Sequence, residues 1–133
     1  MTEQTDKKRT KRRASDDYPT PGPVVDAFLD RIDWFRVRSF LEPCAGDGAI
    51  IDRAAARMTS PRQLVRGVEL RHGGPGFIRA DYLELPQLGV SLEHPHTIAG
   101  PHLDAFDLAI TNPPFNLAGQ FLEKLLRECV TVC

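Results

Sequence analysis

Hydrophobic positions along the chain alternate between short continuous runs and helical spacings. Short apolar runs bounded by Gly, Pro or Asp are typical of buried strands, and apolar residues three or four positions apart indicate helices. The pattern predicts strands at 39–43, 64–70, 77–80, 106–111 and from 129 onward, with helices at 24–32, 50–58 and 117–126. Strands that alternate with helices in this way predict an α/β fold with a mostly parallel sheet.

Each predicted helix carries one apolar face. These faces comprise Val24, Val25, Phe28, Leu29 and Ile32 in the first helix, Ile50, Ile51, Ala54, Ala55 and Met58 in the second, and Leu117, Phe121, Leu125 and Leu126 in the third. Asn116 is the expected N-cap of the third helix, and Glu123 and Arg127 are spaced to form an i,i+4 ion pair. Residues 84–104, which hold three prolines, are expected to form a surface crossover.

A double-proline turn, Asn112-Pro113-Pro114-Phe115, lies between a predicted strand and a predicted helix. Open parallel sheets bind their ligands at such turns. The Asn112 side chain and a turn carbonyl offer two acceptors to an amino group. The prolines fix φ and remove backbone donors, so the turn carbonyls are expected to face outward, and Phe115 offers a ring face to a planar base. A proline-stiffened loop with one packed Phe is the structural alternative.

A glycine turn, residues 44–49, joins the first strand to the second helix. Gly46 and Gly48 allow positive φ and leave no Cβ to block a ligand. The following helix points its free backbone amides at the same place. Glu42 and Asp47 add two carboxylates, which disfavour pyrophosphate and favour a cationic ligand. A plain connection between strand and helix is the alternative.

Two further acidic residues follow predicted strands. Glu69 lies 21 residues after Gly48, a spacing suited to binding the two ribose hydroxyls of a nucleoside. Asp81 follows the third strand and could accept from a purine amino group, with Tyr82 or Leu83 packing on the ring. A solvated Glu and a turn Asp are the corresponding structural alternatives.

Charge is distributed unevenly along the 133 residues, although the net charge is only −1. Residues 1–17 are polar and lack periodicity, which predicts a disordered tail ahead of one domain at 18–133. Six cations fall within seven residues of this tail: Lys7, Lys8, Arg9, Lys11, Arg12 and Arg13. They could contact nucleic-acid phosphates or serve only to keep the chain soluble.

Other sequence features exclude whole classes of protein. No apolar run approaches 18 residues, so no membrane span is expected, and the polar start does not resemble a signal peptide. The cysteines, Cys44, Cys129 and Cys133, are odd in number and lack metal spacing, which predicts reduced thiols in a cytoplasmic protein. The histidines around Pro95 do not match the usual metal-ligand spacings, so no metal is expected.

Taken together, residues 18–133 resemble a class I S-adenosylmethionine-dependent methyltransferase of the amino-methylating DNA type. Leu41-Glu42-Pro43-Cys44-Ala45-Gly46-Asp47-Gly48 resembles the cofactor motif of that family, and residues 112–115 match its (D/N)PP(Y/F/W) motif. Tyr18-Pro19-Thr20-Pro21 resembles the segment that closes over the methionine end of the cofactor. The motif order fits the γ arrangement and is similar to that of phage and prophage adenine methyltransferases. Ala49 stands where some relatives have a third glycine.

The resemblance implies a Rossmann-like fold, S-adenosyl-L-methionine as cofactor and a flipped-out DNA adenine as acceptor. It implies cofactor contacts from Tyr18, Thr20, Pro21, Glu42, Pro43, Ala45, Gly46, Asp47, Gly48, Glu69, Asp81, Tyr82 and Asn112, and catalytic roles for Asn112, Pro113, Pro114 and Phe115. Other planar amino acceptors, namely a protein glutamine, an RNA base or cytosine, stay open. A Rossmann dehydrogenase is disfavoured by Glu42 and Asp47. The pattern says nothing about oligomeric state.

The sheet of this family has seven strands, whereas the sequence reaches only the predicted fifth. We therefore expect a C-terminally incomplete domain, with an inactive cofactor-binding remnant as a further alternative.

Overall fold

One parallel sheet forms the centre of the structure, a computed structural model that describes residues 20–71, 77–91, 93–94, 96–100 and 103–133. Its strands are β1 (Ser39–Glu42), β2 (Leu64–Glu69), β3 (Phe77–Arg79), β4 (Phe106–Ala109) and β5 (Cys129–Val132). They are ordered β3-β2-β1-β4-β5, and every pairing is parallel. The predicted α/β fold is confirmed, and its sheet is compatible with a Rossmann-like arrangement.

Strand β1 occupies the middle of the sheet and sets its register. Phe40 lies opposite Val65 on one side and Leu108 on the other. After β1 the chain builds β2 and β3 outward in one direction, and it then returns to place β4 on the opposite side of β1. The carboxyl ends of β1 and β4 therefore flank the point at which the strand order reverses, where open sheets of this kind leave a crevice.

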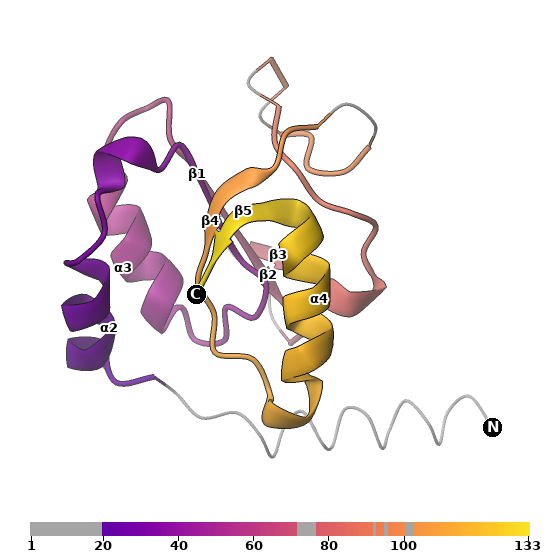
Figure 1. The fold of residues 1–133 in the computed structure, drawn as a ribbon, viewed down its shortest axis with the longest axis horizontal. Coiled ribbons are helices and arrows are strands. Elements are labelled where there is room, and N and C mark those ends of the chain that lie inside the picture. Colours follow the sequence, from indigo (N-terminus) through magenta and orange to yellow (C-terminus); the bar gives the residue numbers. More distant parts are fainter. Residues whose placement is uncertain (1–19, 72–76, 92, 95, 101–102) are drawn as a thin grey trace.

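Helices cover both faces of the sheet (Figure 1). Helices α2 (Gly22–Leu29) and α3 (Ala49–Arg57) lie on one face and α4 (Ala118–Glu128) on the other. Three short 3-10 turns, η1 (Trp34–Arg36), η2 (Tyr82–Glu84) and η3 (Phe115–Leu117), complete the described elements. Successive strand residues point to opposite faces, so Phe40 joins the core under α2 and α3 whereas Leu41 joins the core under α4.

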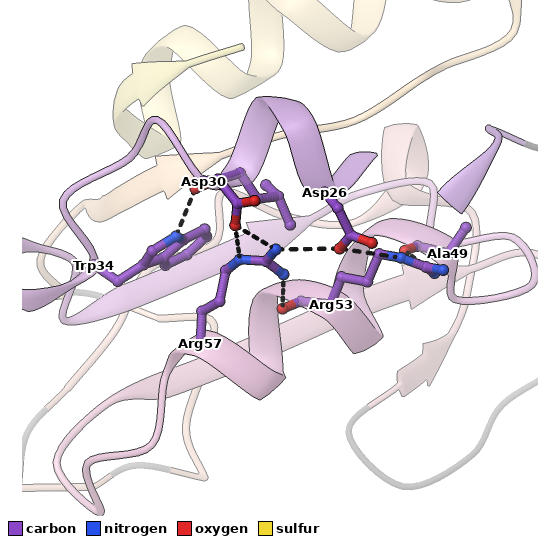
Figure 2. Close-up of polar contacts among 7 residues, drawn as sticks. Asp26, Asp30, Trp34, Ala49, Arg53 and Arg57 are labelled. Atoms are coloured by element: carbon purple, nitrogen blue, oxygen red, sulfur yellow. Dashed lines mark hydrogen bonds and ion pairs between the residues drawn. The ribbon is translucent and has the colours of Figure 1, made fainter. Parts of the chain in front are cut away.

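Charged side chains join α2 to α3 across their exposed flank (Figure 2). The Arg57 guanidinium lies 2.7 Å from Asp30 and 3.1 Å from Asp26, and Arg53 lies 3.4 Å from Asp26. Arg53 also donates to the carbonyl of Ala49 at 3.2 Å, in the first turn of α3. Helix α2 is thus tied to α3, the helix that follows the glycine turn.

Some expected helix faces differ from the structure. Val25, Leu29, Phe121 and Leu125 are buried as expected, but Val24, Phe28 and Leu126 are exposed by 59%, 45% and 64%. The face of a helix that is buried is set by where the neighbouring element lies, and apolar residues at its edge stay in solvent. The Glu123–Arg127 ion pair is present at 3.3 Å.

Two local predictions are wrong. Asn116 does not cap α4, because the turn after Pro114 tightens into η3 and Leu117 becomes the N-cap, without a side-chain hydrogen bond. The crossover 84–104 does not lie wholly on the surface: Leu88 and Val90 are buried. Isolated bridges from these two residues to Ala99 and Asp104 fold the crossover back onto itself.

Removing the charge at the α2–α3 contact should destabilise the fold. Arg57→Met keeps the apolar stem and loses the guanidinium. We expect the free energy of unfolding, measured by chemical denaturation at low salt, to fall by about 1 kcal/mol, since a network exceeds an isolated exposed pair. High salt should shrink the loss because it screens these charges.

Arg36→Met is the matched control. Arg36 pairs with Asp33 at 3.3 Å, but the two side chains are 87% and 60% exposed, so we expect a loss below about 0.5 kcal/mol. Equal losses in the two variants would show that the α2–α3 network adds nothing.

Candidate functional site

Backbone hydrogen bonds hold the glycine turn to β2 and also close the turn on itself. The Ala45 amide donates to the Val68 carbonyl of β2 at 3.0 Å, and the Gly48 amide donates to the Ala45 carbonyl at 2.9 Å. Gly46 and Gly48 both adopt positive φ, at 56° and 91°, where a side chain would be strained. A Cβ at Gly46 would meet nothing within 4 Å. The turn therefore leaves open space that a bound group could use.

Glu42, at the end of β1, is a buried carboxyl group beside this turn. Its side chain is 2% exposed, and its Oε2 atom has no hydrogen-bond partner among the described residues. Burial raises its pKa well above the ordinary value; the Ile51 backbone N–H opposes this rise, and the negative charges of Asp47, Asp52 and Glu69 add to it. Among the described residues, no cation contributes to this pKa, whereas a nearby cation would bring it down.

Glu69, the last residue of β2, and Asp81, which follows β3, both line one cleft beside the glycine turn. Glu69 is buried, and its carboxylate accepts from the Leu70 amide at 2.8 Å. Asp81 caps η2 by accepting from the Leu83 amide at 3.1 Å. Because β2 and β3 are parallel, both residues lie at the carboxyl ends of their strands.

The double-proline turn follows β4, the strand paired with β1. Pro114 is buried with extended backbone, and its carbonyl accepts from the Leu117 amide at 3.0 Å. The expectation that both proline carbonyls face outward is therefore wrong for Pro114, whose carbonyl closes the first turn of η3. Phe115 leaves the turn with its side chain 82% exposed.

These segments line a common cleft at the carboxyl ends of the strands. Its lining comprises Pro43, Cys44, Gly46, Glu69, Leu70, Arg71, Ala80, Asp81, Tyr82, Asn112, Pro114 and Phe121. The cleft has a cavity volume of about 40 Å³. A ligand of nucleoside size would therefore extend beyond it.

Asn112 also borders a second hollow, of about 370 Å³, on the side of α2. Apolar side chains from α2, from α3 and from the segment after β4 dominate this hollow, among them Val24, Phe28 and Ile110. The Asn112 side-chain amide donates to the Thr20 hydroxyl at 3.3 Å, just before α2 begins. Asn112 thus lies between the cleft and an apolar hollow.

Not every predicted site residue lines the cleft. Thr20 borders only the second hollow, and Glu42 lies outside both linings. Asp47 instead accepts from the Ala49 amide at 3.1 Å, which shapes the start of α3. Tyr18 lies outside the described residues.

Five residues of the lining were not predicted as site residues: Cys44, Leu70, Arg71, Ala80 and Phe121. The first four lie at or next to predicted strand ends, so their position along the chain could have indicated them. Phe121 is part of an apolar helix face, and no sequence signal separates it from the other core positions.

Comparison with models of known protein families and with curated proteins finds no match to this chain. None of the helices in the described part of the chain combines the length and apolar character needed to cross a membrane. Within the same residues, no three His, Cys, Asp or Glu side chains gather closely enough to hold a metal ion. The chemistry of the cleft is therefore inferred from its own residues.

The buried Glu42 carboxyl should make stability depend on pH. Its pKa in the folded protein exceeds the ordinary value of 4.5, so the folded state binds more protons between these two pKa values. This contribution to stability is complete below the lower value and is lost as the pH rises through the higher one. Without ligand, Glu42→Gln should become progressively more stable than the natural protein as the pH is raised, in melting temperatures measured across a pH series.

Glu123→Gln, at a side chain 74% exposed, provides the control and should shift the melting temperature little at any pH. A Glu42→Gln variant destabilised equally at every pH would contradict the assignment of a strained buried charge.

Proposed function

We propose that this chain is an S-adenosylmethionine-dependent methyltransferase acting on the exocyclic amino group of adenine in DNA. One observation carries the proposal: the cleft at the reversal of strand order is lined by Gly46, Glu69, Asp81 and Asn112 together. Residues far apart in sequence thus offer acceptors for a cationic nucleoside and for an amino group at one place.

The hydrogen-bond acceptors in the cleft, and Glu42 beside it, suit this cofactor. S-Adenosylmethionine supplies a methyl group made electrophilic by its sulfonium, and it also carries an ammonium. Glu42 would hold the ammonium, which would supply the positive partner that its buried oxygen lacks. Glu69 would accept from the ribose hydroxyls, and Asp81 would accept from the adenine amino group.

Several acidic residues near the glycine turn also weigh against a phosphate ligand. The negative charges of Asp47, Asp52 and Glu69 each act on Glu42 and raise its pKa. A pyrophosphate would add negative charge to this group and would be repelled. A dinucleotide cofactor is disfavoured for that reason.

Asn112 and Pro113 would prepare the acceptor. The lone pair of an aromatic amino nitrogen is shared with its ring, which makes the nitrogen a weak nucleophile. If the Asn112 side-chain oxygen and the Pro113 carbonyl each accepted one N–H, the nitrogen would become pyramidal and its lone pair localised. Positioning would then supply much of the rate, because effective molarities of oriented groups reach about 10⁵ M or more.

The place of Asn112 supports this role. It borders both the cleft and the apolar hollow, a position suited to a residue that brings two molecules together. A base inside a duplex is out of reach, so the target would have to flip out. The exposed Phe115 ring could then stack on it, which is worth about 1–3 kcal/mol for each base.

The experiment measures cofactor binding and methyl transfer separately. S-Adenosylmethionine should raise the melting temperature of the purified chain, since a ligand that binds only the folded state stabilises it. Transfer of a labelled methyl group is then followed into unmethylated DNA, RNA and protein. Label in RNA or protein would move the proposal to another planar amino acceptor, and an unchanged melting temperature would refute it.

Replacing Asn112 should impair methyl transfer while leaving cofactor binding nearly intact. Asn112→Ala removes one acceptor for the target amino group, so we expect methyl transfer to fall by at least about 100-fold, as for other groups that act mainly in the transition state. The affinity for S-adenosylmethionine, measured by calorimetric titration, should stay within a few-fold of the natural value.

Asn116→Ala provides a matched control, because Asn116 is exposed and lies outside both linings. It should retain binding and transfer. Loss of cofactor binding in Asn112→Ala would assign Asn112 to the cofactor instead of the acceptor.

A further inference from the structure

Glu128, in the last turn of α4, is a buried carboxylate with several donors around it. Its side chain is 1% exposed. It accepts from the Tyr82 hydroxyl, from the Lys124 ammonium and, at 2.6 Å, from the Leu88 amide. Lys124 also donates to the Pro86 carbonyl at 3.0 Å. The carboxylate therefore links α4 to two segments about 40 residues away, η2 and the crossover.

Side chains of α4 contact both the ring and the hydroxyl group of Tyr82. The ring packs on Phe121 with centroids 5.4 Å apart and planes inclined by 28°, and the Lys124 ammonium lies 4.3 Å from its centre. Phe121, Lys124 and Glu128 are three and four positions apart, so they share one side of the helix. Burial, together with the hydrogen bond to Glu128, raises the Tyr82 pKa, so its hydroxyl keeps its proton and remains a donor.

One side of this cluster forms a wall of the cleft, and the other side lies behind that wall. Tyr82 and Phe121 line the cleft beside Asp81, whereas Lys124 and Glu128 do not. The other end of α4 follows η3 and the double-proline turn that holds Asn112. Helix α4 thus contacts Tyr82 through Glu128 in its last turn, and the double-proline turn with Asn112 lies just before its first turn.

Stability alone is a weak reason for this arrangement. Replacing a buried ion pair by apolar side chains of similar volume is often neutral or stabilising, because desolvation offsets the attraction between the charges. A directional contact to a buried carboxylate does fix the orientation of a ring, which apolar packing specifies less tightly. The wall of a binding cleft is a place where orientation matters.

We propose that Glu128 is a positioning residue for the nucleoside. It holds the Tyr82–Phe121 wall in register with the Asn112 turn, so nucleoside affinity depends on a carboxylate that lies outside the cleft. The inference rests on the proposed function and deepens it, because it names the residues that shape the nucleoside end of the site.

The test compares two ligands that share a nucleoside. S-Adenosylmethionine carries an ammonium, whereas 5′-methylthioadenosine lacks the amino-acid part. Dissociation constants are measured by calorimetry and by NMR titration, at a temperature where circular dichroism shows every variant folded. Tyr82→Phe keeps the ring and removes its hydroxyl, and Glu128→Gln keeps the shape and removes the charge.

Both variants should weaken both ligands by at least about fivefold, the equivalent of one lost hydrogen bond. Glu42→Gln should weaken S-adenosylmethionine alone, because 5′-methylthioadenosine has no ammonium to lose. Glu123→Gln, on the same helix but paired outward with Arg127, should leave both dissociation constants unchanged.

The possible outcomes separate the two proposals. If Tyr82→Phe and Glu128→Gln lower the melting temperature but bind both ligands as the natural protein does, the cluster is only a scaffold and the inference is overturned. If Glu128→Gln does not fold, Tyr82→Phe decides alone, since Glu128 then keeps its contacts with Lys124 and Leu88. If the natural protein binds neither ligand, the proposed function fails, and this inference fails with it.

Discussion

The parallel pairing of β1 with both β2 and β4 is the constraint from which the rest of the site follows. Parallel neighbours end on the same side of a sheet, so the glycine turn after β1, Glu69 at the end of β2 and Asn112 after β4 meet there. If β1 lay at an edge, one of these groups would be lost from the cleft. The site is thus a consequence of strand order before it is a matter of individual side chains.

The region around the glycine turn is costly to maintain in the free protein. A carboxyl group that is 2% exposed and has an unpartnered oxygen opposes folding when it is ionised. Active and binding sites commonly hold groups that are unfavourable until a ligand arrives. Glu42 fits that description better than Glu128, whose carboxylate is also buried but accepts from three donors. The same residue type therefore occurs in two different electrostatic surroundings in one chain.

Much of the framework could be predicted from the sequence, because it depends on local pattern. The apolar runs located the strands, and the turns after them followed from Gly46, Gly48 and the two prolines. The details that failed depend on contacts between distant segments. Glu128 looks like a solvated residue beside Arg127, and only its contacts with Tyr82 and Leu88, 46 and 40 positions away, make it a buried hub. Asn116 is not the N-cap of α4 for a related reason: a 3-10 turn follows Pro114, so α4 begins only after Leu117.

The exposed ring of Phe115 has a kinetic consequence. The residue is 82% exposed, and each of the two prolines before it has a fixed φ, so the course of the backbone into Phe115 is set before any flat molecule arrives. Stacking there would require little reordering of the turn backbone. We therefore expect ordering of this turn to contribute little to the time that such an encounter takes.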